Sequence, residues 1–427
     1  LEENMTPVQY SNALTSSVTW GAILFMFLIH SVPINLALSP DVTHLIRFRS
    51  VLQDPMNHLE SWNASDTSPC KWRGISCING RVIALDLTGM NLTGYVSGAL
   101  GMLSELRSIN LTDNKFYGPI PQELSLCSSL EVISLGKNDL SGTLPSSVGN
   151  LSRLQVLDLT NNGLTGCISS NLGNLVHLRE LLLSENLFGC SMPTELGNLN
   201  SLEQLILYSN KITGAIPSSL GNLTRLSVLR AGGNLLSGSV PPELSKCLGL
   251  NVLGLAENKI QGEIPAVFGG MHNLTILTLR LNNMIGIIPP ELGNLSNLLM
   301  LSLSDNQLSG PIPREFGKLT SVTRLFLYRN ALVGSIIEEI GNCTSIKELD
   351  LSENHLRGSI TEAITFLPSL EVLYLHQNNL SGQIPLGLIE LSSLRKLDFS
   401  INGLTGTIPI GLQHLKNLTS LQVSENH

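Results

Sequence analysis

Hydrophobic residues follow one fixed pattern along most of this chain. Aliphatic residues fill the first, fourth and sixth positions of a stretch that ends in asparagine, as at Leu154, Leu157, Leu159 and Asn162. The last two of these leucines lie on one face of a short strand, because strand side chains alternate between the two faces. The residues between them point the other way and are mostly polar. The pattern therefore predicts short strands, each with one buried face and one exposed face.

The strand pattern recurs at a constant interval of 24 residues. Met90 stands in the slot of the first asparagine, and the later slots hold Asn114, Asn138, Asn162, Asn186, Asn210, Asn234, Asn258, Asn282, Asn306, Asn330, Asn354, Asn378, Asn402 and Asn426. One such strand cannot bury its apolar face alone, whereas coils stacked about 4.8 Å apart share one continuous core. The sequence therefore predicts an α/β solenoid whose strands form a single parallel sheet.

Each part of the repeat has a physical role. The asparagine amide carries both a donor and acceptors for backbone groups at the turn, so we expect a ladder of amides along the core. The arm that follows, as at Leu308, Gly310, Ile312 and Pro313, is expected to be extended but sparsely paired, since proline donates no hydrogen bond. The segment after the arm, such as residues 291–295, spaces its leucines as a short helix for the opposite side of the coil.

The complete repeat, LxxLxLxxNxLxGxIPxxLGNLxx, resembles the extracellular leucine-rich repeats that are specific to plants. These occur in receptor-like kinases, receptor-like proteins and secreted inhibitors of microbial enzymes, and the resemblance covers residues 80–427. It implies a right-handed superhelix with a long parallel sheet on its concave face and a second set of short strands made by the arm. It also implies that the chain is the ectodomain portion of a plant-type leucine-rich-repeat receptor-like protein kinase.

Residues 39–79 resemble the N-terminal cap of the same family. Leu45, Phe48 and Leu52 are spaced to form one apolar helix face that covers the first coil. The stretch SPCKWRGISC resembles the cap signature, and the resemblance implies a disulfide between Cys70 and Cys77. Residues 80–427 are then the repeats. They stop one residue after a repeat asparagine without a closing cap, so we expect this chain to be a C-terminally incomplete fragment.

Residues 1–38 have the layout of a secretory signal peptide. An apolar block at residues 21–29 precedes small residues near Ala37 and Ser39. The chain begins with Leu1, and no lysine or arginine precedes the block, so a buried segment of the mature protein is the alternative. The block is roughly half of the ~20 residues that a membrane-spanning helix needs. Secretion would permit disulfides and N-glycosylation.

Ten asparagines lie in N-x-S/T glycosylation sequons beyond the predicted signal peptide. They are Asn63, Asn91, Asn110, Asn150, Asn222, Asn273, Asn294, Asn342, Asn379 and Asn417. Most of them fall outside the strand positions that face away from the core. Asn110 is the exception, near the N-terminal end of the repeats.

The remaining cysteines divide into two groups. Cys127, Cys247 and Cys343 stand where other coils place leucine, and they are too many coils apart to bridge, so we expect buried thiols. Cys167 and Cys190 are 23 residues apart, which places their Cα atoms about 6 Å apart on adjacent coils, within disulfide range. Strand alternation could direct their Cβ atoms to opposite faces. A second disulfide and two free thiols therefore both remain open.

Composition and motifs exclude several functions. The chain has 427 residues, a net charge of −8, 42% hydrophobic residues and 14% charged residues. It therefore lacks both the polarity of a disordered chain and the cationic excess of a nucleic-acid binder. It has no zinc-protease, nucleophile-elbow, phosphate-loop or kinase motif, and its histidines show no metal-ligand spacing. We predict no enzyme activity, cofactor, metal or nucleic-acid partner for this chain; a serine/threonine kinase domain would lie beyond it.

The exposed face of the sheet indicates where a ligand would lie. Residues four, two and one before each repeat asparagine face outward, and most of them are small. The exceptions are Tyr208, Arg230, Arg280, Phe326, Tyr328, Arg329, Tyr374 and His376. Aromatic and arginine side chains are the usual anchors of protein and peptide recognition. They predict a binding stripe about seven coils or ~35 Å long, which would fit an extended peptide of about ten residues.

Two functions fit these features. The first is the ligand-binding extracellular domain of a receptor-like kinase at the plasma membrane, which senses a secreted peptide or protein and recruits a shorter leucine-rich-repeat co-receptor. Membrane attachment would come only from a segment missing from this chain. The alternative is a kinase-less receptor-like protein or a secreted inhibitor of microbial wall-degrading enzymes. The large number of coils favours the first, and the uninterrupted spacing leaves no room for the insertion that steroid-binding relatives carry.

Overall fold

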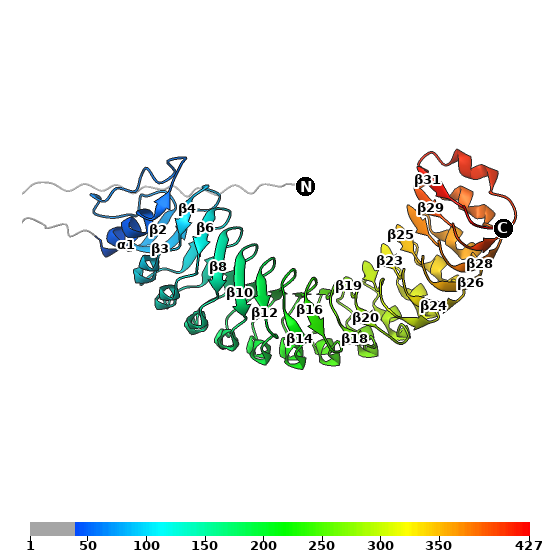
Figure 1. Cartoon of the computed structure of the whole chain (residues 1–427), viewed down its shortest axis with the longest axis horizontal. Helices are drawn as coiled ribbons and strands as arrows, with labels where there is room; N and C mark the ends of the chain where they lie inside the picture. The colour runs from blue at the N-terminus through cyan, green and yellow to red at the C-terminus, as the bar shows by residue number, and fades with distance from the viewer. Residues whose placement is uncertain (1–38) are drawn as a thin grey trace, which may run out of the picture. The chain divides into compact units, whose positions relative to one another are not determined.

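The computed structural model describes residues 39–427, so the expected signal peptide at residues 1–38 lies outside the described residues. The described coils stack along an arc, and one sheet of 16 strands lines its inner, concave side (Figure 1). Its strands, in spatial order, are β2 (Ile75–Ile78), β3 (Arg81–Asp86), β5 (Ser108–Asn110), β7 (Val132–Ser134), β9 (Val156–Asp158), β11 (Glu180–Leu182), β13 (Gln204–Ile206), β15 (Val228–Arg230), β17 (Val252–Gly254), β19 (Ile276–Thr278), β21 (Met300–Ser302), β23 (Arg324–Phe326), β25 (Glu348–Asp350), β27 (Val372–Tyr374), β29 (Lys396–Asp398) and β31 (Ser420–Gln422).

The register of this main sheet follows the repeat length. From β3 onward the strands are parallel and equivalent leucines pair across neighbouring coils, for example Leu205 with Leu229. Only the first pair, β2 with β3, is antiparallel. In β13 and β19, for example, the central leucine is buried and its two neighbours are half-buried. The predicted solenoid with a parallel concave sheet is confirmed.

The arms after the repeat asparagines form a second set of shorter sheets. One has six strands, β1 (Leu52–Gln53), β4 (Thr93–Tyr95), β6 (Lys115–Gly118), β8 (Asp139–Thr143), β10 (Gly163–Cys167) and β12 (Leu187–Gly189). Two have two strands each, β14 (Thr213–Ala215) with β16 (Leu235–Ser237) and β18 (Gln261–Gly262) with β20 (Asn283–Met284). The last contains β22 (Ser309–Gly310), β24 (Ala331–Gly334), β26 (His355–Ser359), β28 (Asn379–Gly382) and β30 (Gly403–Leu404).

Short 3₁₀ helices form the convex side of every coil. They are η1 (Gly98–Met102), η2 (Gln122–Leu126), η3 (Ser146–Asn150), η4 (Ser170–Asn174), η5 (Thr194–Asn198), η6 (Ser218–Asn222), η7 (Pro242–Lys246), η8 (Ala266–Gly270), η9 (Pro290–Asn294), η10 (Arg314–Lys318), η11 (Glu338–Asn342), η12 (Glu362–Phe366), η13 (Leu386–Glu390) and η14 (Ile410–His414). Proline at the residue before most of these helices fixes φ near the value that starts the turn. Their leucines complete a single continuous core.

The predicted asparagine ladder runs through this core. The Asn258 side-chain oxygen accepts a hydrogen bond from the backbone N–H of Leu236 in the preceding coil at 3.0 Å. Its side-chain nitrogen donates to the carbonyls of Ala231, Leu255 and Ala256 at 3.0–3.2 Å. The other repeat asparagines bond in the same way, as Asn330 does. Each amide therefore joins two coils.

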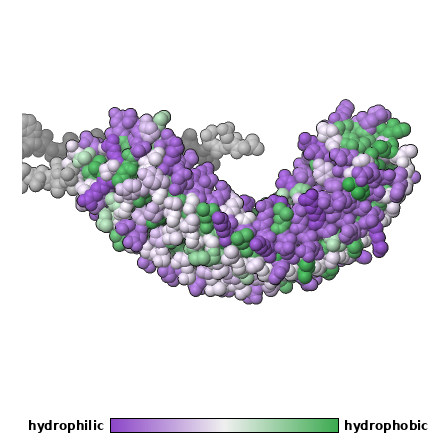
Figure 2. Space-filling view, viewed as in Figure 1, coloured by the Kyte–Doolittle hydropathy of each residue, from purple (hydrophilic) through white to green (hydrophobic). Residues whose placement is uncertain are grey.

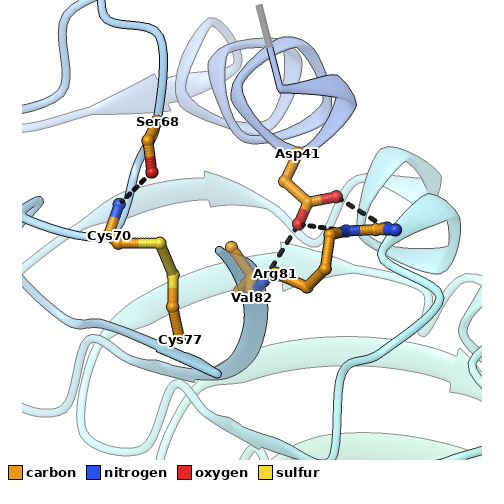
Figure 3. Close-up of a disulfide and its surroundings, with 6 residues drawn as sticks. All are labelled: Asp41, Ser68, Cys70, Cys77, Arg81 and Val82. Atoms are coloured by element: carbon orange, nitrogen blue, oxygen red, sulfur yellow. Dashed lines mark hydrogen bonds and ion pairs between the residues drawn. A yellow bond between two sulfur atoms is a disulfide. The ribbon is translucent and has the colours of Figure 1, made fainter. Parts of the chain in front are cut away.

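The cap begins with helix α1 (Pro40–Arg49), whose Leu45 and Phe48 are fully buried. Leu52 does not share the helix face as expected. The helix ends before it, and Leu52 lies half-buried in β1, which pairs antiparallel with β4. Asp41 ties α1 to the first coil, because its carboxylate accepts hydrogen bonds from Arg81 at 3.1 Å and from the backbone N–H of Val82 at 2.9 Å (Figure 3).

The cysteines resolve as two disulfides and three thiols. Cys70 and Cys77 form the disulfide that the cap resemblance implied (Figure 3). Cys167 and Cys190 are also bonded, with Cα atoms 5.3 Å apart. Alternation does not apply at Cys190, because its φ of 59° is left-handed and interrupts the strand geometry. The thiols of Cys127, Cys247 and Cys343 are buried, as predicted.

Candidate ligand-binding surface

All eight residues of the predicted stripe lie on the exposed, concave face of the main sheet. We name each coil by its repeat asparagine, so that coil 210 is the coil that contains Asn210. At the N-terminal end of the stripe, the Tyr208 hydroxyl donates to Glu185 at 3.0 Å. Arg280 forms an ion pair with Glu257. Arg230 differs from both: it is exposed, and within residues 39–427 no carboxylate oxygen lies within 4.0 Å of its guanidinium.

The centre of the stripe lies on β23 and the turn after it. Phe326 and Tyr328 are half-buried side by side on one coil. Arg329 has a left-handed φ of 49° and is exposed, with ion pairs to Glu353 at 2.9 Å and Asp305 at 3.5 Å on the two neighbouring coils. The hydrogen bond to Glu353 raises the pKa of the Arg329 guanidinium. A hollow of about 360 Å³ opens beside Arg329.

Tyr374 and His376 form the C-terminal end of the stripe. Their rings meet edge to face with centroids 6.1 Å apart. The Nδ1 atom of His376 lies 3.5 Å from a carboxylate oxygen of Asp398, on the next coil. Burial raises the pKa of the Asp350 carboxyl on the preceding coil, and hydrogen bonds from Ser352 oppose that shift. This end of the surface is therefore acidic as well as aromatic.

The eight residues of the stripe therefore do not form one continuous line: five of them lie in two groups, and three stand alone. Phe326, Tyr328 and Arg329 lie together, with Tyr374 and His376 two coils away, whereas Tyr208, Arg230 and Arg280 stand singly on separate coils. Sequence reasoning missed the acidic partners of the arginines and of Tyr208, which are Glu185, Glu257, Asp305 and Glu353. All four occupy the position directly before a repeat asparagine, and that shared position is the signal that could have found them.

Sequence reasoning also missed two serines between the arginine and aromatic parts of the stripe. Ser302 and Ser304 are 3% and 0% exposed, and neither hydroxyl has a hydrogen-bond partner. In two later coils the hydroxyl equivalent to that of Ser304 is satisfied within its own coil. Ser352 donates to Asp350 at 2.5 Å, and Ser400 donates to Asp398 at 2.6 Å. Coil 306 lacks this acceptor because serine replaces the aspartate.

Comparisons with known proteins match several parts of the chain to leucine-rich repeats and their N-terminal domain. Residues 38–78 match the leucine rich repeat N-terminal domain, residues 153–237 a leucine-rich repeat region, and residues 129–151, 273–295, 297–319, 345–367, 369–391 and 393–415 single leucine rich repeats. The solved ectodomain of the Arabidopsis receptor kinase HAESA, in complex with an IDA peptide hormone, is 32% identical with a TM-score of 0.73. The alignment covers 91% of this chain and 70% of that one.

The chain belongs to the plant leucine-rich-repeat receptor kinase ectodomains. A second HAESA structure, bound to IDA and to the co-receptor SERK1, is 25% identical to this ectodomain with a TM-score of 0.50, covering 91% of this chain and 94% of that one. MDIS1-interacting receptor like kinase 1 of Arabidopsis thaliana is 46% identical over 76 residues, which is 17% of this ectodomain and 8% of that protein. The ectodomain thus aligns with less than a tenth of that curated relative.

The sequons of the ectodomain leave most of the concave face free. Nine of them are exposed, on the arms, the convex helices or the turns between helix and strand: Asn63, Asn91, Asn150, Asn222, Asn273, Asn294, Asn342, Asn379 and Asn417. Asn110 is half-buried on β5, well N-terminal to Tyr208. Asn379 lines the hollow beside Arg329, so a glycan there would stand at the edge of the stripe. A glycan at any of the other nine would leave the stripe open.

Other chemistry is sparse in the described part of the ectodomain. Residues 39–427 contain no cluster of three or more histidine, cysteine or acidic residues that could hold a metal ion. They also contain no helix with the length and hydrophobicity to cross a membrane. On the face seen in Figure 2, hydrophobic residues form small separate groups on a mainly hydrophilic surface.

Proposed function

We propose that this chain is the ligand-binding ectodomain of a receptor-like kinase at the extracellular side of the plasma membrane. Its ligand is a secreted peptide or small protein that lies along the concave stripe from Tyr208 to His376. The bound ligand recruits a shorter leucine-rich-repeat co-receptor. The kinase domain and the membrane span belong to the full-length protein, as in the longer relatives whose names include a kinase.

The observation that carries the proposal is the grouping of arginine and aromatic side chains on the concave face, most of which the predicted glycans leave open. Phe326 and Tyr328 remain half-buried and half-accessible, so each can lose further apolar surface to a ligand. Arg230 has no internal ion pair among the described residues and can hold a ligand acceptor without breaking an existing contact. Such residues dominate the binding energy of protein interfaces.

A peptide selection tests the surface even while the natural ligand is unidentified. The secreted chain is immobilised, and binders are selected from a phage library of random 15-residue peptides. The test variant is Tyr328→Ala with Arg329→Asn, because asparagine tolerates the left-handed backbone of residue 329. We expect selected peptides to bind this variant at least about tenfold more weakly, a loss of roughly 1.4 kcal/mol.

The matched control is Tyr117→Ala with Lys115→Asn, which removes an exposed tyrosine and a nearby cation from the arm sheet. Control affinity should equal that of the parent. Peptides that bind the parent and the Tyr328/Arg329 variant equally well would remove the stripe as the ligand site.

Sequencing the full-length transcript separates the receptor kinase from the alternatives. A stop codon soon after residue 427, with no ~20-residue apolar span and no kinase, would favour a secreted inhibitor.

A further inference from the structure

The arm side of four neighbouring coils carries a groove that shares no residue with the stripe. It crosses coils 282, 306, 330 and 354, beside the arms that contain β20, β22, β24 and β26 and beside the first residues of η9, η10 and η11 (Figure 1). Its volume is about 680 Å³, which falls within the range of binding clefts. It spans three coil intervals, or about 14 Å, which is the length of roughly four extended residues.

The groove and the arms beside it are more apolar than the repeat requires. Ile287 lines the groove, and Ile285 and Val333 lie on the same arms; these side chains are 56%, 47% and 42% exposed. They occupy the third and fifth positions after a repeat asparagine, where the other coils hold mostly serine or threonine. Exposed apolar residues that cluster in this way are typical of interaction sites.

Two successive coils at the groove also lack the proline that precedes most of the convex helices. Ile337 and Thr361 take its place in coils 330 and 354. Ile337 lines the groove and is half-buried, so it extends the apolar floor. The Thr361 hydroxyl donates a hydrogen bond to the Glu338 carboxylate at 2.6 Å. That bond holds one carboxylate of the groove in place.

The rim of the groove is acidic. Three glutamates, Glu315, Glu338 and Glu339, line it together with one cation, Arg314. Within residues 39–427, no lysine, arginine or histidine nitrogen lies within 4.0 Å of a carboxylate oxygen of these glutamates. Their charge can therefore pair with cations of a partner without breaking an existing ion pair, and such charge-assisted hydrogen bonds are strong.

Charge separates the possible occupants of the groove. A second copy of the chain that packed groove against groove about a two-fold axis would bring two sets of these glutamates together, which like-charge repulsion opposes. A partner segment with arginine or lysine beside aliphatic residues matches both the rim and the floor, because long basic side chains can reach a charged rim while their stems stay on apolar surface.

Predicted glycans leave the groove accessible to a protein. The arms of the four coils contain no sequon. The nearest sequons on the helices are Asn294 and Asn342, the last residues of η9 and η11, whereas the groove is lined by the first residues of those helices.

We propose that this groove docks a short extended segment of a partner protein, in which one or two large aliphatic residues stand beside arginine or lysine. The aliphatic side chains pack on Ile287, Pro311 and Ile337. The cations pair with the three glutamates of the rim. The groove is a second site that does not depend on the proposed stripe, so one chain can hold a ligand and this partner at the same time.

An array of synthetic nine-residue peptides tests this chemistry on the secreted chain. The peptides carry three arginines and two leucines in every arrangement within a glycine–serine background, and a second array has glutamate in place of arginine. Glu338→Gln with Glu339→Gln removes two carboxylates of the rim and should weaken the best arginine peptides at least tenfold in isothermal titration calorimetry. The control is Glu195→Gln with Glu243→Gln, which makes the same change of net charge on η5 and η7 and should change affinity less than twofold.

A second variant removes the apolar floor. Ile287→Ser with Ile337→Pro should weaken the same peptides at least fivefold. Both new residues occur at equivalent positions nearby, as Ser335 and Pro313, and the φ of −72° at residue 337 suits proline. The variant should therefore keep the parental melting temperature, which separates loss of binding from loss of folding.

Several outcomes would overturn the docking proposal. One is an arginine array without any peptide that loses affinity on the two groove variants. Another is an equal loss on the Glu195/Glu243 control, which would mean unspecific attraction to an acidic chain. Glutamate peptides that depend on the groove would contradict the proposed charge. A dimer in sedimentation velocity that Ile287→Ser with Ile337→Pro abolishes would make a second copy the occupant.

The groove and the stripe can fail separately. A phage-selected peptide that ignores the Tyr328/Arg329 variant but loses affinity on the groove variants belongs to the groove. The stripe is therefore judged on peptides that bind the groove variants as tightly as the parent.

Discussion

The stacking of coils depends on the side-chain amide of each repeat asparagine. We predict that Asn258→Ala lowers the free energy of unfolding by about 1–3 kcal/mol, because it leaves the Leu236 N–H and the carbonyl of Ala231 without their partner. Chemical denaturation followed by circular dichroism measures the loss. The matched control is Asn198→Ala, an exposed asparagine at the end of η5, which should change stability by less than about 0.5 kcal/mol. Equal stability of the two variants would refute the ladder.

The seven cysteines allow a second prediction at this scale. Burial raises the pKa of Cys127, Cys247 and Cys343 to about 11. Only about one thiol in a thousand is then a thiolate at pH 8, and the thiolate is the form that reacts. Iodoacetamide should therefore label no cysteine in the folded protein, three after unfolding without reductant, and all seven after reduction, as intact mass spectrometry can count. Five labels before reduction would show that Cys167 and Cys190 are free.

The sequence predicts a residue's contacts correctly where its position in the repeat has the same structural role in every coil. The asparagine amides and the buried thiols at leucine positions follow from the repeat alone, because every coil supplies the same environment. The pairing of Cys167 with Cys190 could not be decided in this way. It depends on Cys190 occupying the slot where other coils have a left-handed glycine, and strand alternation does not hold at that backbone conformation.

Packing between neighbouring helices explains why most 3₁₀ helices carry a glycine, which the repeat motif alone does not explain. The glycine before the last residue of most 3₁₀ helices lies against the backbone of the next helix. At Gly197, between η5 and η6, an added Cβ would lie 2.5 Å from the carbonyl oxygen of Ser219. We predict that Gly197→Ala destabilises the chain by about 1–3 kcal/mol in thermal or chemical denaturation, as overpacking does.

Gly270, at the end of η8, is the control for that experiment. An added Cβ there meets nothing within 4 Å, so Gly270→Ala should leave stability unchanged or raise it by up to about 1 kcal/mol. A similar loss for both variants would show that backbone freedom, and not close approach of the helices, is what the glycine provides. Leucine spacing predicted these helices, but the sequence does not show how closely neighbouring coils approach.

Across the whole solenoid, the candidate site was only partly predictable. The positions that face the concave side follow from strand alternation, so all eight stripe residues lie where the sequence placed them. Their grouping does not follow from it, because Glu353 and Asp305 hold Arg329 through contacts between coils. The burial of the unpaired Ser302 and Ser304 hydroxyls likewise depends on the neighbouring coils, and the sequence of one coil does not show it.

Stability along the molecule should be local, because each coil pairs only with its neighbours. Asp41 is 1% exposed and ties α1 to the start of β3 through Arg81 and the N–H of Val82. Asp41→Ala leaves the Arg81 guanidinium without its counter-charge and the Val82 N–H without its acceptor. Because the Arg81 side chain is 40% exposed, we expect a loss of about 1–3 kcal/mol, which is less than that for a fully buried pair. We predict that the cap then opens first.

Hydrogen–deuterium exchange read by mass spectrometry locates that opening. In Asp41→Ala, amides of α1 and of β2 to β5 should exchange at least tenfold faster than in the parent, whereas those of β21 to β31 keep their parental rates, since stability is distributed by region. Asp139→Ala, at an exposed position of the arm strand β8, should match the parent throughout. Uniformly faster exchange in every coil would mean that the solenoid unfolds as one cooperative unit, and the cap would then protect the distant ligand surface as well as the first coils.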